Sequence, residues 1–136
     1  MTDEFRHYRR WFYAAALYNV VWGSVVVLFP AVLLRMAHGN AGTGALPFVQ
    51  VTGMMVGVYA YGYYLLAREP HRYSGLIWIA LAGKTLGPLG FVYSASIHAL
   101  PWSFGWVCVF NDVIWWPVFW RFALTYAREH NAPSHR

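Results

Sequence analysis

The chain contains long apolar stretches without an ionisable side chain, and these constrain its fold more than any other feature. Residues 11–34 and 46–67 include no Asp, Glu, Lys, Arg or His. Residues 74–97 contain only Lys84, and residues 104–127 only Asp112 and Arg121. A bilayer core about 30 Å thick is crossed by a helix of about 20 apolar residues. The sequence therefore predicts an all-α integral membrane protein, a four-helix bundle forming one domain over residues 1–136.

The composition supports this class. Only 11% of the residues are charged, while 59% are hydrophobic and 20% aromatic. A soluble domain normally carries about 25% charged residues. The net charge of +5 comes from residues that flank the apolar stretches. Topology and anionic headgroups explain it, so membrane lipids are the expected surroundings and nucleic acid is not.

The positions of the arginines predict the orientation, because cytoplasmic loops retain positive charge. On one side of the membrane lie Arg6, Arg9, Arg10, Arg68, Arg72, Arg121, Arg128 and Arg136. Only Arg35 falls in a loop on the other side. We therefore expect a multi-pass protein with both termini in the cytoplasm.

Two charges of opposite sign lie at mid-membrane. Lys84 is about 14 Å from the cytoplasmic start of its span, and Asp112 about 12 Å from the outer start of its own. Buried ionisable groups in membranes are costly, so they normally face the bundle and have a partner. Asn19 falls in the same layer. The candidate ligand-binding residues are Lys84, Asp112, Asn19, Asn111, Trp22, Trp115 and Tyr59.

Two prolines lie close to these charges. A proline inside a helix removes the hydrogen bond to the carbonyl four residues earlier. Pro88 is expected to free the carbonyl of Lys84, and Pro117 that of Val113. Opened backbone of this kind is tolerated in membranes where it lines a cavity or is repaired by neighbours. The layer is either a ligand site or a structural ion pair, and the sequence leaves both open.

Small residues recur where helices are expected to pack, because membrane helices associate through close contact. The third stretch carries Ala80, Gly83, Gly87, Gly90 and Ser94 at spacings of three and four. The second contains Gly53 and Gly57, and the first Gly23. Such seams predict tight packing within the bundle, or contact with a second copy or a larger membrane complex.

Other chemistries have little support in the sequence. The histidines lie outside the apolar stretches, which disfavours membrane-embedded haem, and Cys108 is expected to be a packing residue. A Schiff base on Lys84 is disfavoured because four helices enclose little room for a chromophore. His38 and His98 share the outer side and could meet at a surface metal site, although loop histidines seldom do. We expect no catalytic residue, metal or cofactor. A binding protein is favoured over an enzyme.

Three short motifs carry a resemblance that covers nearly the whole chain. They are Tyr18-Asn19-x-x-Trp22-Gly23, Gly83-Lys84-x-x-Gly87-Pro88 and Asn111-Asp112-x-x-Trp115-Trp116-Pro117. Together they resemble a group of small bacterial four-span membrane proteins of uncharacterised function. The resemblance implies a place in the bacterial cytoplasmic (inner) membrane and supports treating the mid-membrane residues as a set, without implying an activity.

The sequence thus favours a protein that binds or translocates a small polar or anionic solute at the Lys84, Asp112 and Asn19 layer. The first alternative is a non-transporting accessory or assembly subunit of a larger membrane complex. The second alternative is a membrane-embedded enzyme acting on a lipid, which would need a more complete acid–base set than one lysine and one aspartate.

Overall fold

The computed structural model describes residues 3–38 and 44–127, and throughout this part of the chain every regular element is helical. The helices are α1 Asp3–Leu28, α2 Pro30–Met36, α3 Leu46–Arg68, α4 Leu76–Ser96, η1 Trp102–Phe104, α5 Gly105–Asn111, η2 Val113–Trp115, α6 Trp116–Phe122 and η3 Ala123–Ala127. The expected all-α fold is confirmed. The tail cations Arg128 and Arg136, and loop residues 39–43, lie outside the described residues.

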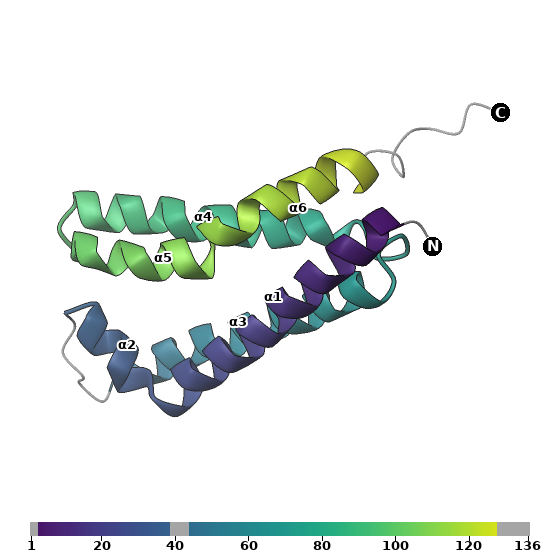
Figure 1. The fold of residues 1–136 in the computed structure, drawn as a ribbon. Coiled ribbons are helices and arrows are strands. Elements are labelled where there is room, and N and C mark those ends of the chain that lie inside the picture. The colour runs from purple at the N-terminus through teal and green to yellow at the C-terminus, as the bar shows by residue number, and fades with distance from the viewer. Residues whose placement is uncertain (1–2, 39–43, 128–136) are drawn as a thin grey trace.

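The helices form two layers (Figure 1). Helix α3 runs back along α1 in the most extensive helix contact of the structure, while α4 lies beside α5 and α6. The layers meet through α3 and α4 and through α1 and α6. The start of α1 and the end of α6 lie at the same end of the molecule (Figure 1).

Three segments are helical, long and apolar enough to cross a membrane: Arg6–Leu28, Leu76–Ser96 and Trp102–Tyr126. Helix α3 is not among them, although it has 23 residues and no charged residue before Arg68. Its four tyrosines, Gln50 and several glycines lower its mean hydropathy. The structure therefore establishes an all-helical protein with three apolar helices of membrane-spanning length.

The first predicted helix, 11–34, was wrong at both ends. Helix α1 begins eight residues earlier, at Asp3, and ends at Leu28, and the short helix α2 follows from Pro30. The backbone of Phe29 leaves the helical region, with φ −128° and ψ 53°. A residue that precedes proline is pushed out of the helical conformation, so Pro30 separates the two helices. Helix α3 differs from the predicted 46–67 by one residue, and α4 from 74–97 by two at its start and one at its end.

Glycines bring α1 and α3 into backbone contact. A methyl group on Gly23 would lie 2.7 Å from the carbonyl oxygen of Gly53 and 3.2 Å from the amide nitrogen of Gly57. A methyl group on Gly53 would in turn lie 2.9 Å from the carbonyl oxygen of Gly23. The predicted close packing of small residues is confirmed at this seam, where glycine is required at Gly23 and Gly53 because no side chain fits.

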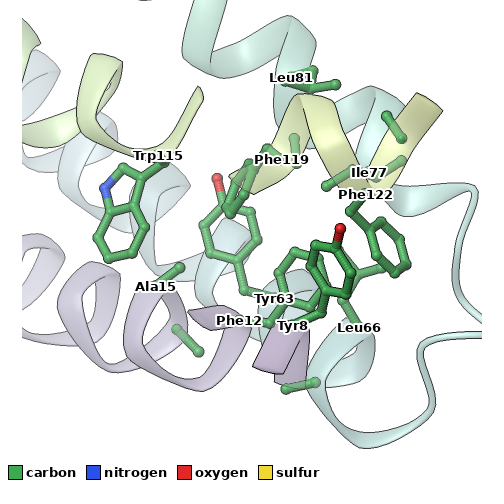
Figure 2. Close-up of a cluster of buried hydrophobic side chains, with 14 residues drawn as sticks. Tyr8, Phe12, Ala15, Tyr63, Leu66, Ile77, Leu81, Trp115, Phe119 and Phe122 are labelled. Atoms are coloured by element: carbon green, nitrogen blue, oxygen red, sulfur yellow. The ribbon is translucent and has the colours of Figure 1, made fainter. Parts of the chain in front are cut away.

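The hydrophobic core joins the two layers near the chain ends (Figure 2). It is rich in aromatic rings in edge-on contact, which the ring quadrupole favours. Phe12 lies with its ring centroid 4.9 Å from Phe122, and Phe119 with its centroid 5.3 Å from Tyr63. Tyr63, Phe12, Phe119 and Phe122 are almost fully buried. This cluster holds α1, α3, α4 and α6 together.

The outward surface is strongly apolar. Large side chains such as Leu17, Phe48, Val58, Leu86 and Trp106 are each more than 60% exposed. Contiguous apolar surface of this extent is rare on soluble monomers. The surface is consistent with a protein whose helices contact lipid.

Candidate functional site

Lys84 and Asp112 form a buried ion pair between α4 and the α5–α6 segment. The ammonium nitrogen Nζ of Lys84 lies 3.3 Å from Oδ1 of Asp112. The two residues are only 4% and 7% exposed. The lysine ammonium also donates to the backbone carbonyl of Asn111, and the side-chain amide of Asn111 donates to Oδ1 of Asp112 at 2.9 Å. The expectation that these two charges meet at one depth is therefore confirmed.

Pro88 lies inside α4 and leaves the carbonyl of Lys84 without its usual amide donor. The indole Nε1 of Trp116 supplies the replacement, donating to this carbonyl at 3.1 Å. The sequence predicted an opened carbonyl at Lys84, but not that the indole of Trp116 meets it. This bond is a second polar link between α4 and the α5–α6 segment.

The second opening differs from the prediction. Helix α5 ends at Asn111, and Asp112 itself leaves the helical conformation, with φ −122° and ψ −57°. Helix α6 starts at Trp116, which places Pro117 in its first turn. A proline there removes no hydrogen bond that the helix would make. The helix predicted over 104–127, with its opening at Pro117, is therefore interrupted earlier than expected: the break lies at Asp112, where it presents the carboxylate to Lys84.

The glycines of α4 make room for polar side chains rather than for another helix backbone. A methyl group on Gly87 would lie 2.9 Å from Oδ2 of Asp112. A methyl group on Gly83 would lie equally close to the hydroxyl of Tyr59, at 2.9 Å. Gly90, by contrast, is exposed, and no described atom outside its own helix turn would meet its methyl group within 4 Å. The uniform packing stripe predicted for this helix is wrong at Gly90.

These side chains surround a cavity of about 420 Å³ between the two layers. Its lining contains Asn19, Tyr59, Lys84, Asn111 and Asp112, five of the seven candidate ligand-binding residues. Also in the lining are Thr52, Met55, Val56, Tyr63, Gly83, Leu86 and Gly87. The volume falls within the range of small-molecule sites, about 300–1,000 Å³. The α3 contribution was missed, apart from Tyr59, because Thr52, Met55 and Val56 carry no chemical signature.

The other two candidates lie elsewhere. Trp22 is half-buried on α1 and does not line the cavity. Trp115 is buried in the aromatic core, with its ring centroid 5.6 Å from that of Tyr18 and 6.2 Å from that of Phe119. It lies close to Asp112 along the chain, but its side chain packs among aromatic rings instead of lining the cavity.

Two amide oxygens of the site have no partner. Asn19 is only 2% exposed, and its amide nitrogen donates to the carbonyl of Val56 at 3.4 Å. No described residue donates to Oδ1 of Asn19 or to Oδ1 of Asn111, although both atoms are buried. Unsatisfied buried polar atoms are rare in proteins and call for an explanation.

His38 and His98 line a separate pocket of about 330 Å³ at the opposite end of the layers. Each follows a helix end in a left-handed backbone conformation, with φ 55° and 61°. Within residues 3–38 and 44–127, no three His, Cys, Asp or Glu side chains are grouped as metal ligands. The two histidines therefore share a pocket without forming a metal centre of three protein ligands.

Comparison with known proteins adds no relative: no family model matches the chain, and no curated protein or solved structure matches it either. The resemblance to small bacterial four-span proteins stays a prediction, carried by the three motifs.

Proposed function

We propose that this protein is a small four-span membrane protein that binds a small polar solute at mid-bilayer, or lets it pass. The observation that carries the proposal is a cavity of about 420 Å³ lined by a buried ion pair and by Asn19. Polar groups at such a depth are costly and lean toward function. An ion pair needed only for packing requires neither a cavity nor an unpartnered amide beside it.

The proposed topology includes α3 as the fourth span, with both termini in the cytoplasm of a bacterium. Helix α3 packs along α1 over its length, and its Tyr59 and Val56 line the same cavity as residues of the three apolar helices. The arrangement of arginines supports the orientation. The start of α1 and the end of α6 lie at one end of the molecule, which agrees with an even number of crossings (Figure 1).

A charge-swap series tests the function. Lys84→Met and Asp112→Asn each remove one partner of a buried pair, and breaking such a pair costs about 3–5 kcal/mol. The exchange Lys84→Asp with Asp112→Lys restores complementarity. If the pair is part of a ligand site, the exchange regains stability but not binding, because the charges that face the solute are reversed.

The probes are acetamide, acetate and acetamidinium, three molecules of similar shape with charges of zero, −1 and +1. Saturation-transfer NMR on their methyl protons detects weak binding to the protein in nanodiscs, and uptake into proteoliposomes detects passage. We expect at least one probe to bind the unaltered protein and to lose binding in the exchange variant. Unchanged binding in both single variants contradicts the proposal.

A second candidate, the accessory subunit, is favoured by one observation. Gly90 lies on an exposed part of α4 that no other described element covers. A glycine exposed on an apolar helix suits contact with another membrane protein. The variant Gly90→Leu separates the two candidates. If the protein binds a solute, the variant still binds the probe. If it is an accessory subunit, the variant no longer co-purifies with the complex from native membranes.

A further inference from the structure

The charge on Lys84 is already compensated inside the protein. Its ammonium group lies 3.3 Å from Oδ1 of Asp112 and donates to the carbonyl of Asn111. Its nitrogen also lies 5.9 Å from the centre of the Tyr63 ring, an electron-rich face that favours a cation. Within the described residues, this is the one Lys or Arg side chain in the cavity lining. The site therefore offers an anion no uncompensated positive charge.

Apart from the hydroxyl of Tyr59, which can donate as well as accept, the groups of the lining that remain free are hydrogen-bond acceptors. They include Oδ1 of Asn19 and Oδ1 of Asn111, to which no described residue donates. Oδ2 of Asp112 adds a carboxylate oxygen, and the bonds described for this carboxylate all involve Oδ1. All three oxygens belong to residues that line the cavity, and acceptors of this kind attract N–H or O–H donors and repel an anion.

The orientation of both amides is set by their neighbours. The amide nitrogen of Asn19 donates to the carbonyl of Val56, and that of Asn111 donates to the carboxylate of Asp112. Rotating either amide by a half-turn would turn its oxygen toward the acceptor that its nitrogen now faces, the carbonyl oxygen of Val56 or Oδ1 of Asp112. The acceptor character of the free atoms is therefore a property of the site.

The site carries no net charge, because the lysine and the aspartate balance one another. A cationic ligand would add an uncompensated charge at mid-bilayer, which is costly. On these observations, which rest on the function proposed above, we propose that the ligand is a small neutral molecule with at least two N–H or O–H donors, such as a simple amide, a urea or a polyol. This narrows the original expectation of a polar or anionic solute to the neutral class.

The test removes the Asn19 acceptor without removing the cavity. Asn19→Leu keeps a side chain of similar size, and the bond that it loses is long, at 3.4 Å. Gln50→Leu is the matched control, because Gln50 also donates an amide hydrogen to a backbone carbonyl across the α1–α3 pair, that of Val27 at 3.0 Å. Gln50 does not line the cavity. Asn19→Ala is a second variant that removes the oxygen with no risk of steric conflict.

We expect the unaltered protein to bind acetamide in preference to acetate and acetamidinium. Asn19→Leu should weaken acetamide binding at least tenfold, which corresponds to about 1.4 kcal/mol, while Gln50→Leu leaves it unchanged. Near-UV circular dichroism checks that each variant is folded, and Asn19→Ala replaces Asn19→Leu if the latter is not.

The alternative results are distinguishable. Preferred binding of acetate or acetamidinium overturns the neutral-donor assignment but leaves the proposed solute site intact. Acetamide binding that survives in a folded Asn19→Leu variant overturns the role of Asn19 as acceptor. If none of the probes, nor urea or glycerol, binds or passes, the proposed function fails together with this inference.

Discussion

The glycine seam between α1 and α3 yields a sharp prediction, because two glycines of one contact should respond with opposite sign to the same change. Alanine in place of a helical glycine gains about 0.5–1 kcal/mol where its methyl group fits. At Gly57 a methyl group meets no described atom outside its own helix within 4 Å. Gly57→Ala should therefore raise the free energy of unfolding by about 0.5–1 kcal/mol.

At Gly23 the same methyl group would lie 2.7 Å from the carbonyl oxygen of Gly53. Backbone atoms of two helices cannot rotate away, so the helices must separate, and such overpacking costs about 1–3 kcal/mol. After the propensity gain is subtracted, Gly23→Ala should lower the free energy of unfolding by up to about 2.5 kcal/mol. Asn19 lies one turn before Gly23, so separation also lengthens its bond to Val56.

The measurement is reversible unfolding in mixed micelles with increasing SDS, followed by far-UV circular dichroism. Both variants and the unaltered protein are compared at the same detergent ratio. A result in which Gly23→Ala stabilises the protein as much as Gly57→Ala shows that α1 and α3 do not approach through these backbones. The contact geometry derived for the seam is then incorrect.

Two further predictions concern the site and the topology. Gly87→Ala should lower the free energy of unfolding by more than Gly90→Ala does. In an Asp112→Ala background about 1 kcal/mol of this loss should be recovered, because the carboxylate that the methyl group meets is gone. A double-mutant cycle of unfolding measures this coupling and separates it from the effect of placing any side chain before Pro88. The topology is tested by thiol labelling in a Cys108→Ala background. His38→Cys should react with an impermeant thiol reagent added to intact cells, and His71→Cys should react only after the cells are permeabilised. Labelling of both cysteines from the same side would show that α3 does not cross the membrane.

The mid-membrane layer shows how far depth alone can be read from sequence. Counting along the spans placed Lys84 and Asp112 at similar depth, and the structure joins them at 3.3 Å. Trp115 was predicted as a ligand-binding residue beside them, but its ring lies in the aromatic core. Depth depends only on the rise per residue, whereas contact also depends on the direction of the side chain, and the break at Asp112 changes that direction for every later residue.

Proline was interpreted with similar partial success. Pro88 opens the carbonyl of Lys84 as expected, because it lies well inside α4. Pro117 instead lies in the first turn of a new helix, and Pro30 ends α1 earlier than its apolar run suggested. Whether a proline kinks a helix or separates two helices depends on the neighbours that satisfy the freed groups.

The presence of apolar helices long enough to cross a membrane, and the few polar groups among them, could be read from the sequence alone. Long charge-free stretches have no stable place in water, and the few polar exceptions can be located by counting. The folded arrangement of the helices was needed to show that Trp116 donates to the carbonyl of Lys84 and that Gly87 makes room for the carboxylate of Asp112. The same holds for the unpartnered amide oxygens of two residues in the cavity lining. Hydrogen bonds depend on distances of a few tenths of an ångström between helices, and such distances follow from side-chain packing rather than from spacing along the chain.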